Sequence, residues 1–332
     1  MAGQIAAQQA HQSTATRRFT VIAFAFLCIC GVLSATAPIR LSIAIVFLFA
    51  GPHNLSEARY FLTRLPARAG RLKVYFACSV LGTFGLSTAY AALPRLATAW
   101  DISPALLAIC YAIWNTTFLL WIAGLAEMRC RQAPRRHWPW LWPAVLAVAG
   151  CAWFQPLALP VLLAYLHPLM GLWILDREIE KSRPEWTTAC RCLLLTIPVI
   201  VAFIWTVPNA TMDGSAELQQ ATRGIGAFLF PGASLGKLLA THVFLELVHY
   251  GVWLLAVPLA NGKVWSHRFN DIPLMKRRHA RPFVRSLIVC AAFVVATLWI
   301  CFALDYGTTR EVYFAVATVH VLAEVPLLLR LL

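Results

Sequence analysis

Long apolar stretches recur along the whole chain, and this feature constrains its fold most strongly. A helix needs roughly 20 apolar residues to cross the ~30 Å hydrocarbon core of a bilayer. The stretches are rich in Leu, Ala, Val, Trp and Phe and lack the alternating pattern of a transmembrane β-barrel. The sequence therefore predicts an all-α, polytopic transmembrane helical bundle. About ten spans are expected, at residues 19–37, 41–57, 73–93, 104–126, 138–156, 157–175, 190–208, 238–260, 284–304 and 311–330.

Composition excludes a soluble fold. The chain is 60% hydrophobic and only 13% charged, whereas about a quarter of the residues of a soluble domain are charged. Its net charge of +14 is explained by basic loops on the cytoplasmic side of a membrane. Because there is no soluble basic domain, nucleic acid is not an expected partner. The expected partners are the lipid bilayer and a hydrophobic small-molecule substrate.

The distribution of basic residues predicts the orientation. With ten spans, the basic clusters within residues 59–73, 129–136, 177–191 and 263–285 all fall on the same side as Arg17 and Arg18. The positive-inside rule assigns this side to the cytoplasm. We therefore expect an integral protein of a bacterial inner membrane with both termini cytoplasmic. Residues 1–16 are expected to form a disordered cytoplasmic tail, and residues 17–332 a single transmembrane domain.

Ionisable residues inside membrane spans are costly and mark function by default. Three glutamates fall within the predicted spans, each with a histidine three or four residues away and hence on the same helix face. We take these three as candidate catalytic groups: Glu57, Glu246 and Glu324. The candidate metal ligands are His53, His167, His242, His249 and His320. By contrast, the charged stretch 176–181 is expected to be a solvated helix end.

Four of these histidines are predicted to share one depth in the membrane. They lie on the second, sixth, eighth and tenth spans, which all run from outside to inside. Each is roughly 8–12 residues from the outer end, so at 1.5 Å per residue they fall within about 6 Å of one level. The sequence therefore predicts that His53, His167, His249 and His320 meet around one centre.

Imidazole and carboxylate ligands together suit iron, zinc or manganese, and Glu-x-x-His is a ligand pattern of di-iron carboxylate bundles. Non-haem iron is the expected metal ion, with zinc and manganese as alternatives. Supporting contacts are expected from Asn54, Tyr60 and Tyr250. Two alternative roles stay open for the His/Glu pairs: they form hydrogen bonds that hold helices together, or they form a proton or ion path.

Two of the histidine segments resemble those of a known family. Gly51-Pro52-His53-Asn54-Leu55-Ser56-Glu57 resembles the Pro-His-Gly-x-x-Asp segment of the Brp/Blh-type bacterial carotene oxygenases, which cleave β-carotene to retinal in the membrane. Thr318-Val319-His320-Val321-Leu322-Ala323-Glu324 looks like the last histidine segment of that family, with His167 and His249 in order between the two. The resemblance implies metal-ligand roles for these four histidines. It covers four short patches, and the second histidine of the family's third segment is missing after His249.

The expected function is that of a membrane-embedded, metal-dependent enzyme acting on an isoprenoid, a carotenoid or an acyl chain. Whether the chain is an enzyme stays open, with a membrane oxygenase or another oxidoreductase of lipid metabolism as the favoured class. In this scheme the histidines hold the metal, and a glutamate bridges or acts as a base. The alternatives are a transporter or proton-coupled permease that uses the His/Glu pairs, and a non-catalytic membrane scaffold. Against a transporter, the sequence shows no inverted repeat.

Overall fold

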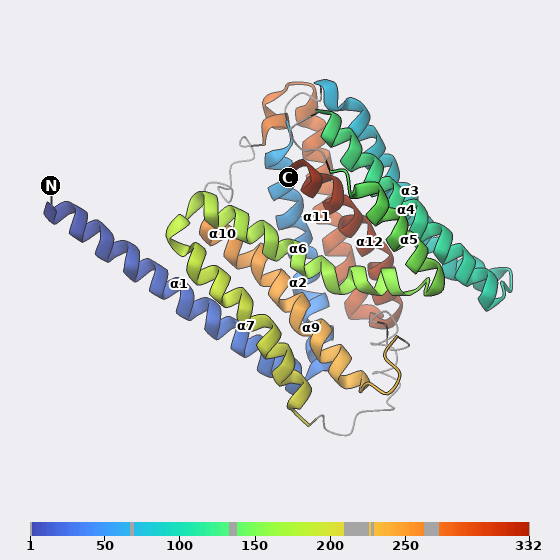
Figure 1. Cartoon of the computed structure of the whole chain (residues 1–332), viewed down its shortest axis with the longest axis horizontal. Helices are drawn as coiled ribbons and strands as arrows, with labels where there is room; N and C mark the ends of the chain where they lie inside the picture. Colours follow the sequence, from blue (N-terminus) through green and yellow to red (C-terminus); the bar gives the residue numbers. More distant parts are fainter. Residues whose placement is uncertain are drawn as a thin grey trace. The chain divides into compact units, whose positions relative to one another are not determined.

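The computed structural model describes residues 2–66, 70–132, 138–208, 226, 229–261 and 272–331, with the backbone alone described for residues 2–12, 71, 311 and 314–316. Every regular element within these ranges is helical, which confirms the predicted all-α fold (Figure 1). The α-helices are α1 (Ala2–Thr36), α2 (Pro38–Arg64), α3 (Lys73–Ala99), α4 (Pro104–Gln132), α5 (Leu141–Phe154), α6 (Ala158–Ser182), α7 (Thr187–Thr206), α9 (Leu235–Gly251), α10 (Val257–Ala260), α11 (Ala280–Leu304) and α12 (Tyr306–Leu331).

Short helical segments complete the fold. A π-helix, η4 (Val252–Ala256), joins α9 to α10, so that Leu235–Ala260 runs as one long helical segment. Single 3-10 turns at η1 (Gly70–Leu72), η2 (Pro184–Trp186) and η6 (Pro273–Lys276) precede α3, α7 and α11.

Each of the ten predicted spans coincides with a helix. Within the described residues, eight helical segments are long and apolar enough to cross a membrane. The remaining two predicted spans coincide with α5, which has 14 residues, and with α12, which has 26. The chain is therefore a multi-pass, integral membrane protein.

The first helix begins earlier than expected. The backbone is helical from Ala2, where the sequence predicted a disordered tail over residues 1–16. Alanine is the strongest helix former, and Ala2, Ala6, Ala7 and Ala10 extend the helix ahead of the apolar stretch. The apolar part that is able to span a membrane starts at Ser13.

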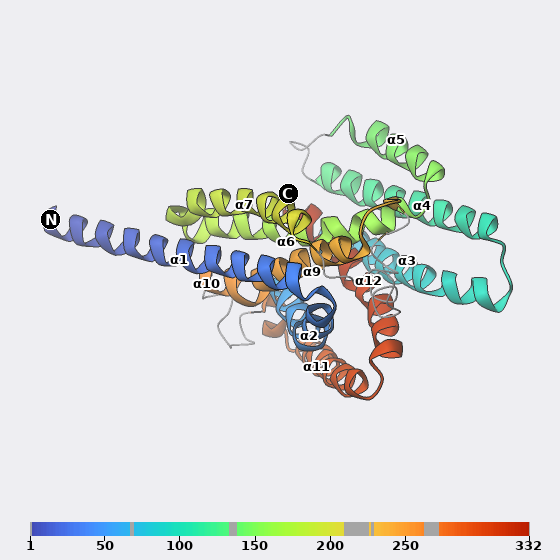
Figure 2. The same ribbon diagram turned by 90° about the horizontal axis from the view of Figure 1, so that it is seen from below.

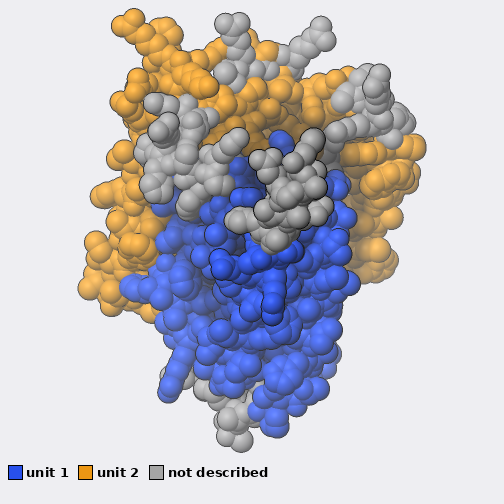
Figure 3. Space-filling model, turned by 90° about the vertical axis from the view of Figure 1, so that its left-hand side faces the viewer, with its two compact units in different colours: residues 1–60, 164–271 blue, residues 61–163, 272–332 orange. Residues whose placement is uncertain are grey.

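The chain divides into two compact units, coloured separately in Figure 3. Unit 1 comprises residues 1–60 and 164–271, and unit 2 comprises residues 61–163 and 272–332. Two of the boundaries fall inside helices α2 and α6, so neither unit is a separate stretch of sequence. The prediction of a single transmembrane domain stays a prediction.

In unit 1, helices α1, α7 and α9 pack against one another, and α1 and α7 lie side by side in both ribbon views (Figures 1 and 2). The rings of Phe19 and Trp186 stack with centroids 4.5 Å apart. Gly251 allows α9 to approach α1 closely, since a Cβ atom there would lie 2.6 Å from the Phe26 ring. Small residues permit such close approach between membrane helices.

In unit 2, α3 packs against α4 and α12, and α4 packs against α5. Indole N–H groups tie the first pair together: Trp114 donates to the Leu86 carbonyl at 2.8 Å, and Trp121 donates to the Cys78 carbonyl at 3.0 Å. A buried cluster that includes Phe118 and Leu322 surrounds Trp114. Buried indole N–H groups need such partners because lipid offers none.

Candidate metal centre

Helix α2 supplies the first two residues of the site, His53 and Glu57, on one face and one turn apart. Both side chains are almost fully buried, with exposed fractions of 1% and 4%. The Nδ1 atom of His53 lies 3.1 Å from the backbone carbonyl oxygen of Phe49. Because a carbonyl oxygen only accepts hydrogen bonds, Nδ1 carries the proton and Nε2 carries the lone pair. Metal-binding histidines are oriented in this way.

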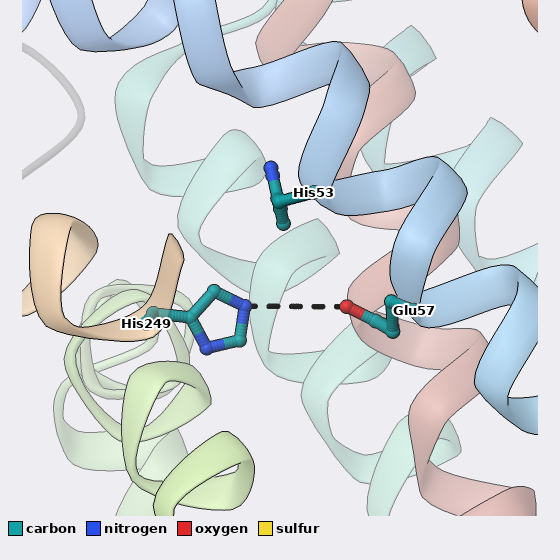
Figure 4. A group of neighbouring side chains, drawn as sticks. All are labelled: His53, Glu57 and His249. Atoms are coloured by element: carbon teal, nitrogen blue, oxygen red, sulfur yellow. Dashed lines mark ion pairs between the residues drawn. The ribbon is translucent and has the colours of Figure 1, made fainter. Parts of the chain in front are cut away.

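Helix α9 brings His249 to this pair. Its Nε2 atom lies 4.0 Å from Oε2 of Glu57, and Figure 4 marks this pair with a dashed line. The ring centroid of His249 lies 5.5 Å from that of His53. His249 is 1% exposed. The donor atoms of His53, Glu57 and His249 all lie within 4.8 Å of one another. Two ligand atoms of a tetrahedral zinc ion, each about 2.0–2.2 Å from it, lie about 3.3–3.6 Å apart, so the three donor atoms would have to move closer together to share one ion.

Helix α6 adds a third histidine beside the other two. The ring centroid of His167 lies 4.3 Å from that of His249. One turn further on, Gly171 faces the same imidazole, and a Cβ atom at this position would lie 2.8 Å from Nδ1 of His249. Only glycine therefore lets α6 come this close to His249. His167 is a candidate fourth ligand.

Aromatic rings enclose the three histidines. The Tyr250 ring lies 4.2 Å from that of His53, and the Trp253 ring lies 6.3 Å from that of His249, both as centroid distances. Tyr60 packs edge-on against Trp253 at 5.4 Å. Trp253 belongs to the π-helix η4, a rare geometry that is frequent at functional sites. Tyr60 and Tyr250, expected from the sequence to support the centre, thus both lie in its surroundings.

His242 and Glu246 form a pair on α9, about two turns and one turn before His249. Nδ1 of His242 lies 3.7 Å from Oε2 of Glu246, and the Tyr165 ring packs edge-on against His242 at 5.5 Å. Within the described residues, neither joins a group of three donor atoms as close as that of His53, Glu57 and His249. A metal role for His242 and a catalytic role for Glu246 stay predictions.

The structure also places a buried acid that sequence reasoning missed. Glu178 was expected in a solvated helix end, but it is 2% exposed, so that expectation was wrong. Its carboxylate accepts hydrogen bonds from Tyr60, Ser182 and Asn261. A signal was present: Glu178 follows His167 by eleven residues, or three helical turns, and so lies on the same face of α6. The charged neighbours Asp176, Arg177 and Glu180 gave this stretch the composition of a solvated helix end.

The remaining sequence-predicted residues, His320 and Glu324, lie on α12 in unit 2. Glu324 is fully buried and His320 is half-buried. Their membership in the centre stays a prediction. The ring contacts bring His53 and His167 each beside His249, while a common depth in the membrane and a shared centre with His320 stay predictions.

The donor set itself limits the chemistry. Two histidines and one carboxylate form the facial triad of non-haem iron(II) oxygenases, which leaves other coordination positions open. The same set also binds catalytic zinc. The chain matches no protein-family model, no curated protein and no solved structure. Its function therefore has to be argued from this site.

Proposed function

We propose that the protein is a membrane-embedded, metal-dependent enzyme that acts on a lipid-soluble substrate. The observation that carries the proposal is the buried group of His53, Glu57 and His249, with donor atoms within 4.8 Å of one another. Carboxylates and imidazoles buried together without a cation would be costly to maintain. The proposed metal is non-haem iron, which two histidines and one carboxylate with open coordination positions suit; zinc and manganese are the alternatives.

In this proposal the histidines hold the ion through ring nitrogens. Glu57 supplies the charge and serves as a ligand or as a base for a bound reactant. The bound metal would supply Lewis-acid or redox chemistry at its open positions. The reaction class is oxidation by a membrane oxygenase or a related oxidoreductase of lipid metabolism.

The substrate class follows from the location of the centre. His53, His167 and His249 all lie within helical segments long and apolar enough to cross the membrane. A molecule dissolved in the bilayer reaches such a depth more easily than a polar one does. Isoprenoids, carotenoids and acyl chains are therefore the candidate substrates. The resemblance of the His53 and His320 segments to those of Brp/Blh-type carotene oxygenases supports this choice.

A proton-coupled permease is the second candidate, favoured by the His242–Glu246 pair on the same helix as His249. Histidine–carboxylate pairs inside membranes serve as proton relays in transporters. This function needs no metal, so metal binding separates the two.

The test is metal analysis of the purified protein, followed by titration with Co²⁺, whose visible absorption reports its ligands. We expect about one metal ion per chain, as a single three-ligand site requires. Glu57→Gln should lose most of the bound metal, whereas Glu180→Gln, at an exposed position on α6, should keep it. A parent protein that purifies without metal and shows no saturable Co²⁺ binding would overturn the proposal.

The orientation belongs to the same proposal: ten spans in a bacterial inner membrane, with both termini cytoplasmic. Reporter fusions after Arg136, Lys181 and Arg278 should all report the cytoplasm. Arg136 lies outside the described residues. A periplasmic signal from any of the three fusions would rule out the ten-span arrangement.

A further inference from the structure

Glu178 lies at a junction of the same helices that form the metal centre. Its Oε2 atom accepts a hydrogen bond from Tyr60 of α2 at 2.9 Å. Its Oε1 atom accepts one from Asn261, the residue after α10, at 2.6 Å, and one from Ser182 at 3.2 Å. Within the described residues, these three donors reach the two oxygens of a carboxylate that is almost fully removed from water.

These contacts also fix the direction of the helices. Helices α2, α6 and α9 first bring together His53, His167 and His249. Further along each chain direction, α2 contributes Tyr60, α6 contributes Glu178, and Asn261 follows α10. The three helical segments therefore run parallel. Glu178 lies about 16 Å along α6 from His167, eleven residues at 1.5 Å each.

Groups that can exchange a proton lie both at the metal centre and around Glu178, and the hydrogen-bonded part of the series begins at Tyr60. Glu57 belongs to the centre, and Tyr60 follows it by one turn on the same face of α2. The Tyr60 hydroxyl is bonded to Glu178, and Glu178 is bonded to Ser182, the last residue of α6, which is half-buried. From Glu57 to the end of α6, the groups are carboxyl, hydroxyl, carboxyl and hydroxyl.

We propose that Tyr60, Glu178 and Ser182 form a proton path between the metal centre and the C-terminal end of α6. The inference rests on the proposed function, since the centre supplies or takes up the proton. In each transfer, Tyr60 Oη gives its proton to Glu178 Oε2 and receives one from the side of Glu57. Glu178 then returns to the carboxylate as its proton leaves through the Ser182 hydroxyl to water at the helix end.

The chemistry of the bonded groups favours a path over a purely structural junction. Tyrosine and serine hydroxyls both donate and accept, so the bonds on either side of Glu178 can reverse as a proton passes. Asn261 can only donate through its amide nitrogen, and it holds the carboxylate in place between the two hydroxyls.

The test follows proton release when Co²⁺ binds to the purified protein, with a pH indicator in a stopped-flow instrument. Binding displaces protons from the ligands. Glu178→Gln and Tyr60→Phe should keep the Co²⁺ absorption spectrum of the parent, because neither side chain is among the proposed ligands. Both should slow proton release at least tenfold. Glu180→Gln, an exposed acid on the same helix, is the matched control and should release protons at the parental rate.

A second measurement tests the proton path in the absence of metal. In metal-free protein, hydrogen–deuterium exchange at the ring nitrogens of His53 and His249 is followed by nitrogen-15 NMR. Glu178→Gln should slow this exchange at least tenfold. Parental rates in both experiments would overturn the path and leave Glu178 as a structural tie. Absence of Co²⁺ binding in the parent would overturn the metal proposal, while the exchange rates would still decide the path.

Discussion

Two helical segments of nearly equal length differ widely in how much protein covers them. Leu235–Ala260, in unit 1, has 26 residues and is 61% buried over its most apolar part. Ala280–Leu304, in unit 2, has 25 residues and is only 6% buried. The buried segment carries His242, Glu246 and His249, whereas the charged side chains of the exposed segment are confined to its start, at Arg281 and Arg285.

This difference shows that hydrophobicity does not determine which helix is buried inside a membrane protein. In lipid there is no hydrophobic force that drives one apolar helix against another. The purely apolar part of α11 can remain in contact with lipid tails, whereas a helix with histidines and a glutamate at the same depth needs protein partners. The polar residues, rather than the apolar ones, therefore identify the core segment.

The largest expected effect comes from removing matched phenylalanines in the two segments. Phe244 on α9 is fully buried, whereas Phe293 on α11 is 71% exposed. Phe244→Ala should lower the free energy of unfolding in detergent by about 3–5 kcal/mol because it leaves a cavity. Phe293→Ala should change it by less than about 0.5 kcal/mol. Equal losses of stability at the two positions would contradict the conclusion that protein covers one segment and not the other.

Next in size is the metal affinity of two histidines within the buried segment. His249→Ala removes a proposed ligand and should weaken Co²⁺ binding at least 100-fold, about 2.7 kcal/mol. His242→Ala removes a histidine outside the close group and should change affinity by less than about threefold, or 0.7 kcal/mol. Isothermal titration of the two variants checks this. A large loss for His242→Ala would extend the centre towards the Glu246 pair.

A smaller effect is expected where the buried segment approaches its neighbour. In Gly251→Ala, the added Cβ would lie 2.6 Å from the Phe26 ring, and such overpacking typically costs about 1–3 kcal/mol. Gly150→Ala is the matched control, since nothing lies within 4 Å of a Cβ there. The control should gain up to about 1 kcal/mol from better helix propensity. The melting temperatures of both variants test this prediction. Destabilisation of the control would show that the loss of a glycine, rather than close packing at Gly251, lowers the stability.

The smallest effect is expected at Glu246. Its partner is His242, at 3.7 Å, and it lies outside the group of His53, Glu57 and His249. Glu246→Gln keeps the shape and the hydrogen bonding, so the cost should be near the ~0.6 kcal/mol average of membrane hydrogen bonds. Metal content should be unchanged. A loss of metal in this variant would make Glu246 a ligand or a bridge and would favour a dinuclear centre.

The sequence alone determined the class of the fold and most of the helices. The requirement for about 20 apolar residues per crossing is local and one-dimensional, so each predicted span coincides with a helix. It also predicted that His53, His167 and His249 come close together, because equal counts along parallel helices give equal heights. The contacts of His53, His167 and His249 follow from this rule.

Only the tertiary structure decided which polar groups act together. Periodicity treats His242 and His249 alike, since both lie on one face with Glu246, yet of these two it is His249 that joins Glu57 and His53. The charged neighbours of Glu178 placed it among solvated side chains, whereas Tyr60 and Asn261, distant in sequence, bond to it and help to bury it. The physical reason is that partners come from other helices. The rotation and spacing of those helices depend on packing at a few small residues, such as Gly171 and Gly251, which no single-helix pattern records.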